Sequence, residues 1–301
     1  MNRAILGVTH SPPGFIPPAG ACDCHTHVFG PAARFAFTAR RLYTPGDALV
    51  EDLFAHQIAL GLDRVVIVQP STYGTDNAAT LWGMRALGRG RARGVAVIGP
   101  ETSDTALVAM RDAGIAGVRL NLQTAGQHDP VAARAALAET AARIGPLGWH
   151  IQVFTNLAMI EALAPDFAAL GLPLVIDHMG AARAEQGLGQ PGFATLLGLV
   201  AAGHAHVKLS APHRISDLPG YPDAAPIARA LIAANPARML WGSDWPHPGG
   251  SARGQTDLGT IEPFHAEDDG AGLARLAAWA DHDPALLHAI LVDNPAGLYG
   301  F

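Results

Sequence analysis

The sequence predicts a single (β/α)8 barrel, in which eight parallel strands alternate with helices. Eight short apolar runs, each ending in polar or glycine residues, alternate with longer stretches that place Ala and Leu at helical spacing. The competing architecture, a doubly wound open sheet, would normally carry a glycine-rich phosphate fingerprint after its first strand. The sequence CDCHTHVFG occupies that position instead, so eight βα units that close a barrel are the favoured interpretation.

Each strand is expected where an apolar run is short and ends in polar chemistry. The expected strands span residues 22–28, 64–69, 94–98, 117–121, 149–154, 174–177, 206–210 and 239–242. The expected helices include residues 76–90, 105–114, 130–144, 157–170 and 193–202. The tail, 283–301, begins with Asp-Pro, a good helix start, and is predicted to place a last helix against the barrel.

The whole chain, 1–301, is predicted to form one domain with a proline-rich extension over residues 1–20. No internal repeat or Gly/Ser linker divides it, and residues 222–226 and 249–259 have the composition of βα loops rather than domain joints. With 49% hydrophobic and 15% charged residues, the chain has enough apolar material for a large core.

The charge and the cysteine content of the sequence indicate the kind of binding partner and the cellular compartment. The formal charge of -6 includes no Lys/Arg run, so a small-molecule site is expected rather than nucleic acid or an anionic membrane. Cys22 and Cys24, the only cysteines, point the same way in a strand and suit no ordinary structural disulfide. The chain also has no signal-like segment and no run of about 18 apolar residues. These features predict a cytoplasmic protein, with its oligomeric state left open.

Three histidines and one aspartate at strand ends form the candidate catalytic group. His25 and His27 end the first strand one residue apart, and strand alternation points both imidazoles to one face. An HxH pair alone is as compatible with a packed, hydrogen-bonded pair as with metal binding or catalysis. His178 ends the sixth strand and Asp244 ends the eighth, so all four side chains are expected to converge at one rim of the barrel.

These positions resemble the amidohydrolase superfamily, which has HxH after strand one, His after strand six and Asp after strand eight. A narrower resemblance is to its 2-pyrone-4,6-dicarboxylate lactonase branch. The segments that carry it, in chain order, are DCHTHVFGP, VIVQPSTYGTDNAATL, GVRLN, VIDHMG, VKLSAPHRIS, WGSDWPHP and DNPAGLYGF. The resemblance covers nearly the whole chain and implies a barrel that hydrolyses a lactone, an internal ester, of a carboxylate-bearing small molecule.

Strands four and five depart from the superfamily's binuclear pattern. Arg119 stands where a bridging lysine or glutamate is expected, and Gln152 and Phe154 stand where a histidine is expected. We therefore expect no binuclear site. One divalent ion, Zn²⁺ or Mn²⁺, held by the candidate catalytic group, and catalysis without a metal are both compatible with this residue set.

Roles follow for individual residues. Asp244 is expected to accept a proton from the water that attacks the lactone carbonyl. By the resemblance, His178 polarises that carbonyl or stabilises the oxyanion. Arg119 and Arg214, after strands four and seven, match the lactonase pattern and are expected to bind substrate carboxylates. The lactonase pattern has a second arginine after strand four, but the segment LNLQTAGQH has none, so one of the carboxylate pockets is expected to bind a different group.

Other polar residues are weaker candidates, because polar groups in loops usually meet only water. Those expected to hydrogen-bond substrate oxygens are Tyr43, Ser71, Tyr73, Asn77 and Gln152.

Two further residues lie near the expected rim. His247 is expected to orient the loop after strand eight, and Lys208 is a charge at the barrel mouth with either a structural or a functional role. The remaining histidines are expected to be solvent-facing or structural, without convergent partners; they include His10, His56, His128, His204, His265, His282 and His288.

The expected function is hydrolysis of a carboxylate-bearing lactone in the catabolism of aromatic compounds or sugar acids. Two alternatives use the same barrel: a metal-dependent decarboxylase would release carbon dioxide, and a sugar-lactone isomerase would move an ester between hydroxyls without net acid release. An inactive barrel that only binds an acidic metabolite is an alternative from a different class, and it would show ligand-induced thermal stabilisation without turnover.

Overall fold

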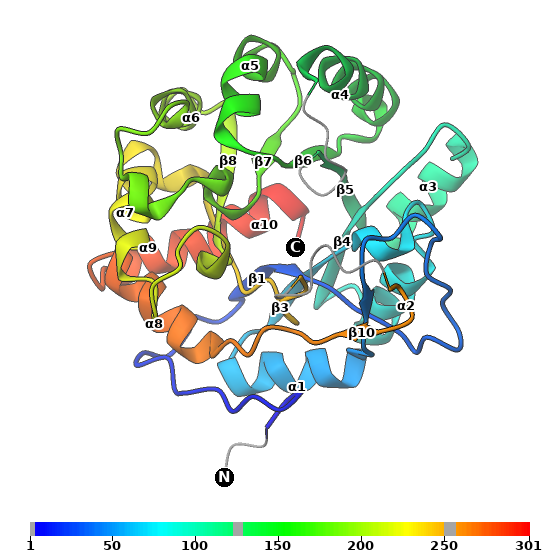
Figure 1. Cartoon of the computed structure of the whole chain (residues 1–301), viewed down its shortest axis with the longest axis horizontal. Coiled ribbons are helices and arrows are strands. Elements are labelled where there is room, and N and C mark those ends of the chain that lie inside the picture. Colours follow the sequence, from blue (N-terminus) through cyan, green and yellow to red (C-terminus); the bar gives the residue numbers. More distant parts are fainter. Residues whose placement is uncertain (1–3, 123–128, 250–256) are drawn as a thin grey trace. The chain divides into compact units, whose positions relative to one another are not determined.

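The computed structural model describes residues 4–122, 129–249 and 257–301 (Figure 1). Its eight-stranded sheet has the order β1-β3-β4-β5-β6-β7-β8-β9, the strand order of the predicted (β/α)8 barrel. Each strand begins within two residues of its predicted start. The strands are β1 (Cys22–Thr26), β3 (Arg64–Val68), β4 (Ala92–Ala96), β5 (Ile115–Asn121), β6 (His150–Phe154), β7 (Leu174–Ile176), β8 (Ala205–Ser210) and β9 (Met239–Gly242).

The helices alternate with these strands as predicted (Figure 1). The α2 helix is shorter than the expected 76–90, because Gly88 leaves the helical region with a φ of 82°. The tail helix begins as predicted, since the Asp283 side chain accepts hydrogen bonds from the next backbone N–H groups. The helices are α1 (Val50–Leu60), α2 (Ala78–Leu87), α3 (Asp104–Ala113), α4 (Pro130–Ile144), α5 (Leu157–Ala168), α6 (Phe193–Ala201), α7 (Ala225–Ala234), α8 (Asp269–Trp279), α9 (Pro284–His288) and α10 (Asn294–Tyr299).

The chain is organised in two compact units. Unit 1 comprises residues 1–115, 243–275 and 301, and unit 2 comprises residues 116–242 and 276–300. The expectation of one domain stays a prediction. Unit 1 also contains two short paired strands, β2 (Thr44–Pro45) and β10 (Ile261–Glu262). Residues 123–128, which include most of the loop with the missing arginine, lie outside the described residues, as do residues 250–256 of the expected loop after strand eight.

The strands supply the core of each unit. In unit 1, β1 is buried along its whole length and so are Val65–Val68 of β3. In unit 2, β6, β7 and β8 are buried at every position. A parallel strand that is covered on both faces has buried residues at every position, which explains this pattern. The two cysteines are buried in β1 as free thiols.

His150 is a buried imidazole in β6 that makes the core sensitive to acid. Burial, and then the charge of Lys208, lower its pKa from 6.5 to about 3. Because its folded pKa lies below its unfolded pKa, the neutral ring contributes stability that is fully present above pH 6.5. That contribution is lost as the pH falls towards 3, since only the unfolded chain takes up the proton readily.

Replacing His150 with leucine, an apolar side chain of similar size, should remove this acid sensitivity. Below pH 6.5 the wild type should lose about 1.4 kcal/mol per pH unit more than the variant, or about 3 kcal/mol by pH 4.5. Urea unfolding of both proteins at pH 7 and pH 4.5 measures the difference. Parallel losses in the two proteins would show that His150 does not titrate in this way.

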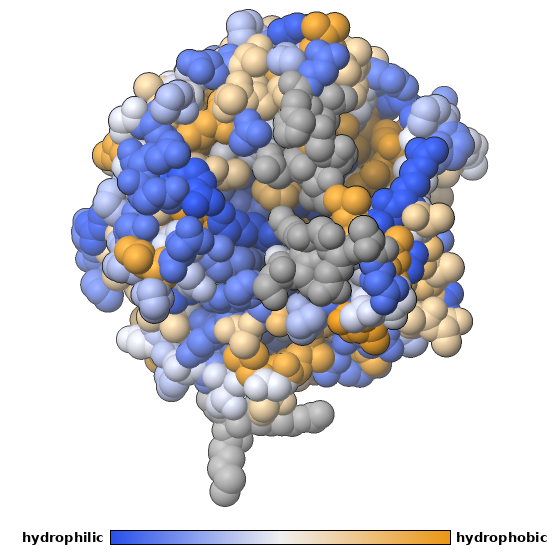
Figure 2. All heavy atoms as spheres, viewed as in Figure 1, coloured by the Kyte–Doolittle hydropathy of each residue, from blue (hydrophilic) through white to orange (hydrophobic). Residues whose placement is uncertain are grey.

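On the face shown in Figure 2, apolar side chains form several patches among the polar ones. Among the large exposed apolar side chains, Ile16 lies in the N-terminal extension, whereas Leu42 and Ile261 lie at or near the paired strands β2 and β10. Among the helices of the described residues, none has the length and apolarity needed to cross a membrane.

Candidate active site

The first histidine pair and Asp244 come together in unit 1. The rings of His25 and His27 lie edge to face, with centroids 5.1 Å apart. Their Nε2 atoms lie 3.6 and 3.5 Å, respectively, from the same carboxylate oxygen, Oδ1 of Asp244. All three side chains are buried. Three of the four predicted catalytic residues therefore form one compact group, which we call the Asp244 group.

Backbone contacts fix the Asp244 carboxylate. The Asp244 N–H donates to the carbonyl of His25 at 2.9 Å, which ties the segment after β9 to β1. Asp244 itself has a φ of 71°, in the left-handed region that few residues other than glycine adopt. Its carbonyl accepts the N–H of His247 at 2.7 Å, and this bond closes a tight turn over residues 244–247.

Asp23 anchors the same segment from within β1. Its carboxylate accepts the backbone N–H groups of His25 and Ser243, each at 3.0 Å, and the Ser243 hydroxyl at 2.5 Å. Burial raises the pKa of Asp23 to about 6 despite these bonds. The Asp23 side chain therefore links the backbone at His25 to the residue that precedes Asp244.

The hydrogen bonding of His27 bears on whether a metal fits. Its Nδ1 lies 2.8 Å from the carbonyl of Val68, and a carbonyl only accepts, so Nδ1 carries the proton. In a neutral ring, Nε2 then directs a lone pair towards Asp244 Oδ1. Because His27 Nε2 and Asp244 Oδ1 both carry lone pairs and lie 3.5 Å apart, a proton or a cation between them is favourable. A histidine that binds a metal usually donates its other N–H to a carbonyl or carboxylate, as His27 does. The donor set therefore fits either a protonated imidazole or one divalent ion.

A second group of charged residues surrounds Asp177 in unit 2. Gln152 donates from Nε2 to Asp177 Oδ2 at 2.9 Å, and its Oε1 accepts a hydrogen bond from Lys208 Nζ at 2.7 Å. Lys208 Nζ and Arg119 Nε each lie 3.4 Å from an Asp177 oxygen, a spacing of ion pairs rather than of short hydrogen bonds. Asp177 and Lys208 are fully buried. Two cations thus face one carboxylate, so these three residues carry one excess positive charge.

His178, the fourth predicted catalytic residue, follows Asp177 in unit 2. Its Nδ1 lies 2.8 Å from Oγ of Ser210, at the end of β8. Its ring meets the ring of Phe154 edge to face at 5.1 Å, and the Phe154 ring also lies 5.4 Å from the Arg119 guanidinium carbon. Phe154 therefore supports both a predicted catalytic histidine and a predicted carboxylate-binding arginine.

The weaker candidates divide by their contacts. Asn77 uses its amide to bridge backbone groups of Thr75 and Val97, and Tyr73 accepts the Gly30 N–H at 2.7 Å through its hydroxyl. Burial raises the pKa of Tyr73 to about 12. Both side chains thus have a structural role in holding loops. The other two loop candidates, Tyr43 and Ser71, are half-buried, and so is the predicted carboxylate-binding residue Arg214.

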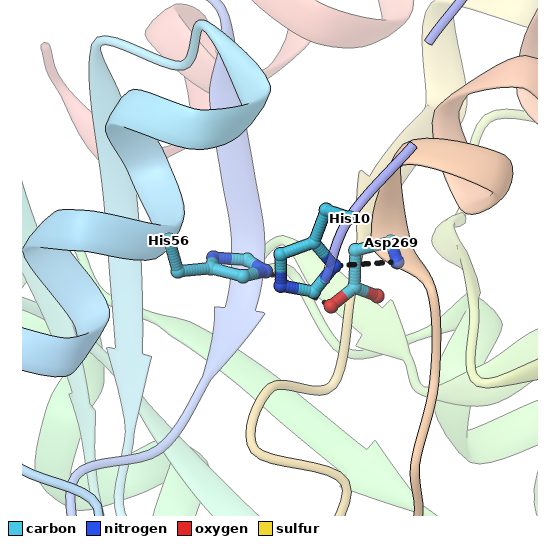
Figure 3. Close-up of side chains that lie close together, drawn as sticks. All are labelled: His10, His56 and Asp269. Carbon is cyan, nitrogen blue, oxygen red and sulfur yellow. Dashed lines mark hydrogen bonds and ion pairs between the residues drawn. The ribbon is translucent and has the colours of Figure 1, made fainter. Parts of the chain in front are cut away.

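The expectation that His10 and His56 lack convergent partners is wrong. Figure 3 shows both rings directed towards Asp269, and all three side chains are buried. Asp269 Oδ2 lies 2.9 Å from His56 Nε2 and 3.0 Å from His247 Nε2. The sequence hides this arrangement because its members come from the N-terminal extension, α1, the turn after β9 and the start of α8.

Asp23, Asp177 and Asp269 were missed as candidates. Asp23 lies two residues before His25 and Asp177 lies directly before His178, so an aspartate close to a strand-end histidine was the available signal. Asp269 had no such signal, because it lies in an acidic run, EDD, that looks like an ordinary helix start.

Comparisons with known proteins place this chain in a family. A model of the amidohydrolase family matches residues 22–301. The chain is 36% identical to a 2-pyrone-4,6-dicarboxylate hydrolase of Comamonas testosteroni and 37% identical to a 4-sulfomuconolactone hydrolase of Rhizobium radiobacter, in both cases over 96% of this chain and 93% of the relative. It is 27% identical to a D-galactarolactone isomerase of Agrobacterium fabrum, over 99% of this chain and 97% of the relative.

A solved structure agrees with these relatives. A candidate 2-pyrone-4,6-dicarboxylic acid hydrolase from Pseudomonas putida matches with a TM-score of 0.78 and 33% identity, covering 94% of this chain and 98% of that one. This match confirms the barrel fold, and the relatives confirm the resemblance to lactone hydrolases that the motifs predict. Because the family model spans nearly the whole chain, this protein belongs to the amidohydrolase family.

Proposed function

We propose that this protein is a hydrolase that opens a lactone bearing at least one carboxylate. The observation that carries the proposal is the Asp244 group, in which one buried carboxylate oxygen lies within 3.6 Å of two imidazoles. Such a carboxylate can take a proton from water, which supports the proposal, and hydrolases among the relatives are named for lactone substrates.

Asp244 is the general base of the proposed reaction. It accepts a proton from water as the water oxygen bonds to the lactone carbonyl carbon. The ring C–O bond then breaks, and the proton passes to the leaving oxygen. The new carboxylic acid ionises and releases the second proton of the water, so the product carries one new carboxylate. His25 and His27 hold the Asp244 carboxylate and stabilise its charge.

The residues around Asp177 suit the binding of the substrate. Asp177 contacts Arg119 through Nε, so the two terminal nitrogens of the guanidinium lie beyond this ion pair and can form a fork to a carboxylate. The excess positive charge beside Asp177 favours an anionic substrate. Arg214 is proposed to bind a second acidic group, and His178 to stabilise the oxyanion. Gln152, Tyr43, Ser71, Tyr73 and Asn77 remain proposed contacts to substrate oxygens.

One divalent ion, Zn²⁺ or Mn²⁺, would be held by His25, His27, Asp244 and His178. When bound, it would supply Lewis acidity and a lower pKa for a bound water. Hydrolysis without a metal is equally compatible with the proposal, because Asp244 performs the same proton transfer in either case.

The test is a pH-stat assay of acid release from a panel of carboxylated lactones that includes 2-pyrone-4,6-dicarboxylate. The protein is assayed as purified, after chelator treatment, and after return of Zn²⁺ or Mn²⁺. Acid release supports the proposal, and its survival or loss on chelation identifies the metal-free or the metal-dependent form. No acid release from any lactone under any of these conditions would contradict it.

Replacing Arg119 with methionine should weaken substrate binding more than chemistry. Methionine keeps contact with Phe154 but removes the fork, so KM should rise about 10- to 100-fold, as expected for loss of one charge-assisted contact of about 1.5–3 kcal/mol. Saturation kinetics on the best substrate of the panel measure KM and kcat separately. An unchanged KM would remove Arg119 from the binding site.

Lactone isomerisation is the second candidate, favoured by the similarity to the galactarolactone isomerase. An isomerase would consume its lactone without releasing acid. Following substrate loss by chromatography alongside the pH-stat trace therefore separates the two reactions, since hydrolysis gives equal rates in both measurements.

A further inference from the structure

Asp269 is a shared acceptor for two buried histidines. Its Oδ2 lies 2.9 Å from Nε2 of His56 and 3.0 Å from Nε2 of His247. Although burial opposes ionisation, the two imidazoles lower the pKa of the Asp269 carboxyl. An ionised carboxylate at the start of α8 is thus hydrogen-bonded both to α1 and to the turn after β9.

The N-terminal extension contacts Asp269 and its neighbour Asp268. His10 Nδ1 accepts the Asp269 backbone N–H at 3.1 Å, and the Ser11 N–H and hydroxyl bind Asp268 at 2.9 and 2.5 Å. The approach is so close that a Cβ on Gly270 would overlap the carbonyl of Ser11. The extension therefore packs against the start of α8, and His10 is its contact with Asp269.

The network reaches the proposed base through one turn. The N–H of His247 donates to the carbonyl of Asp244 at 2.7 Å, and the His247 carbonyl accepts the N–H of His265 at 3.0 Å. Asp244 and His247 have φ values of 71° and 63°. Two non-glycine residues in the left-handed region cost energy that surrounding contacts must offset. The His247 side chain, bonded to Asp269, is the buried anchor of this turn.

The hydrogen bonds favour a positioning network over a metal site, although ligand atoms of His10, His56 and Asp269 lie within 4.8 Å of one another. Because His10 Nδ1 accepts a backbone N–H, its proton lies on Nε2, and that nitrogen then offers no lone pair to a metal. His56 and His247 each direct Nε2 at one carboxylate oxygen, as donors do.

We propose that Asp269 is a positioning residue: through His247 it holds the 244–247 turn so that the Asp244 carboxylate faces His25 and His27. The inference rests on the proposed function, because the consequence of misplacing the turn is a misplaced base. Misplacement of a catalytic group by about 1 Å costs about 100-fold in rate.

The test replaces Asp269 with asparagine, which keeps the size of the side chain but sets an amide against one histidine N–H. We expect kcat to fall about 10- to 100-fold with little change in KM. Adding Asp269→Asn to Asp244→Asn should not lower kcat further, because Asp269 acts only through Asp244. The matched control is Asp268→Asn, which loses contacts to Ser11 but none to His247, and it should keep the wild-type kcat.

Two outcomes would overturn the inference. One is a wild-type kcat in Asp269→Asn, and the other is a double variant whose loss in kcat equals the product of the losses in the two single variants. If Asp269→Asn does not fold, His247 provides the second test. His247→Gln keeps an N–H donor for Asp269 and should keep most of kcat, whereas His247→Leu should lose it. Equal losses in these two variants would also contradict the inference.

A measurement without substrate separates this inference from the proposed function. Amide hydrogen exchange in the segment 243–248 should be faster in Asp269→Asn than in Asp268→Asn, because the turn has lost its anchor. If the wild type opens no lactone but this difference appears, the proposed function fails and the positioning role stands. Equal exchange in an active enzyme would reject the positioning role alone.

Discussion

Replacing Asp244 with asparagine should lower kcat for lactone opening by about 100- to 10,000-fold, the range that a general base contributes. The amide cannot accept the proton of the attacking water. Asparagine can keep the backbone bond from residue 244 to the His25 carbonyl, so the fold should persist. The pH-stat assay at saturating substrate measures the change.

The matched control for this variant is Asp217→Asn, which removes a carboxylate that pairs with Arg183 at the surface. Its kcat should equal that of the wild type. Circular dichroism and thermal unfolding of both variants establish that they fold. An Asp244→Asn enzyme that is folded and keeps most of its rate would show that another group activates the water.

The strand starts and the Asp244 group could be predicted because both follow from local rules. Alternation along β1 placed His25 and His27 on one face, and the end of β9 placed Asp244 beside them. These positions need only the strand period and the common direction of parallel strands. The ends of the five helices with predicted ranges lie within three residues of the observed ends for a similar reason, since capping is a short-range property.

The supporting residues could not be predicted, because their partners are distant in the chain. Asp269 contacts His56 across 213 positions, and Asp23 contacts Ser243 across 220 positions. No periodicity or spacing encodes such pairs, which depend on how loops cross after the strands close. The same reason explains the error on His10, which reads as a residue of a loose extension until Ser11 is seen to bind Asp268.

Replacing Asp177 with asparagine should be the most destabilising polar substitution proposed for this protein, at about 3–5 kcal/mol. Asp177 is the carboxylate that faces Arg119 and Lys208, and all three side chains are buried. Removing one partner of a buried ion pair is strongly destabilising, because the carboxylate no longer offsets the cost of burying the positive charges that face it. Urea unfolding of the variant and the wild type at pH 7 measures the loss.

Two companion variants separate charge from packing. Asp166→Asn removes the partner of Arg134, a pair that is partly exposed at the surface, and should cost about 1 kcal/mol or less. Adding Lys208→Met to Asp177→Asn removes one of the two cations that faced the carboxylate, so the double variant should be more stable than Asp177→Asn alone. If the double variant is instead less stable, the loss in Asp177→Asn reflects packing and hydrogen bonds to Gln152, and the two buried cations do not depend on this carboxylate.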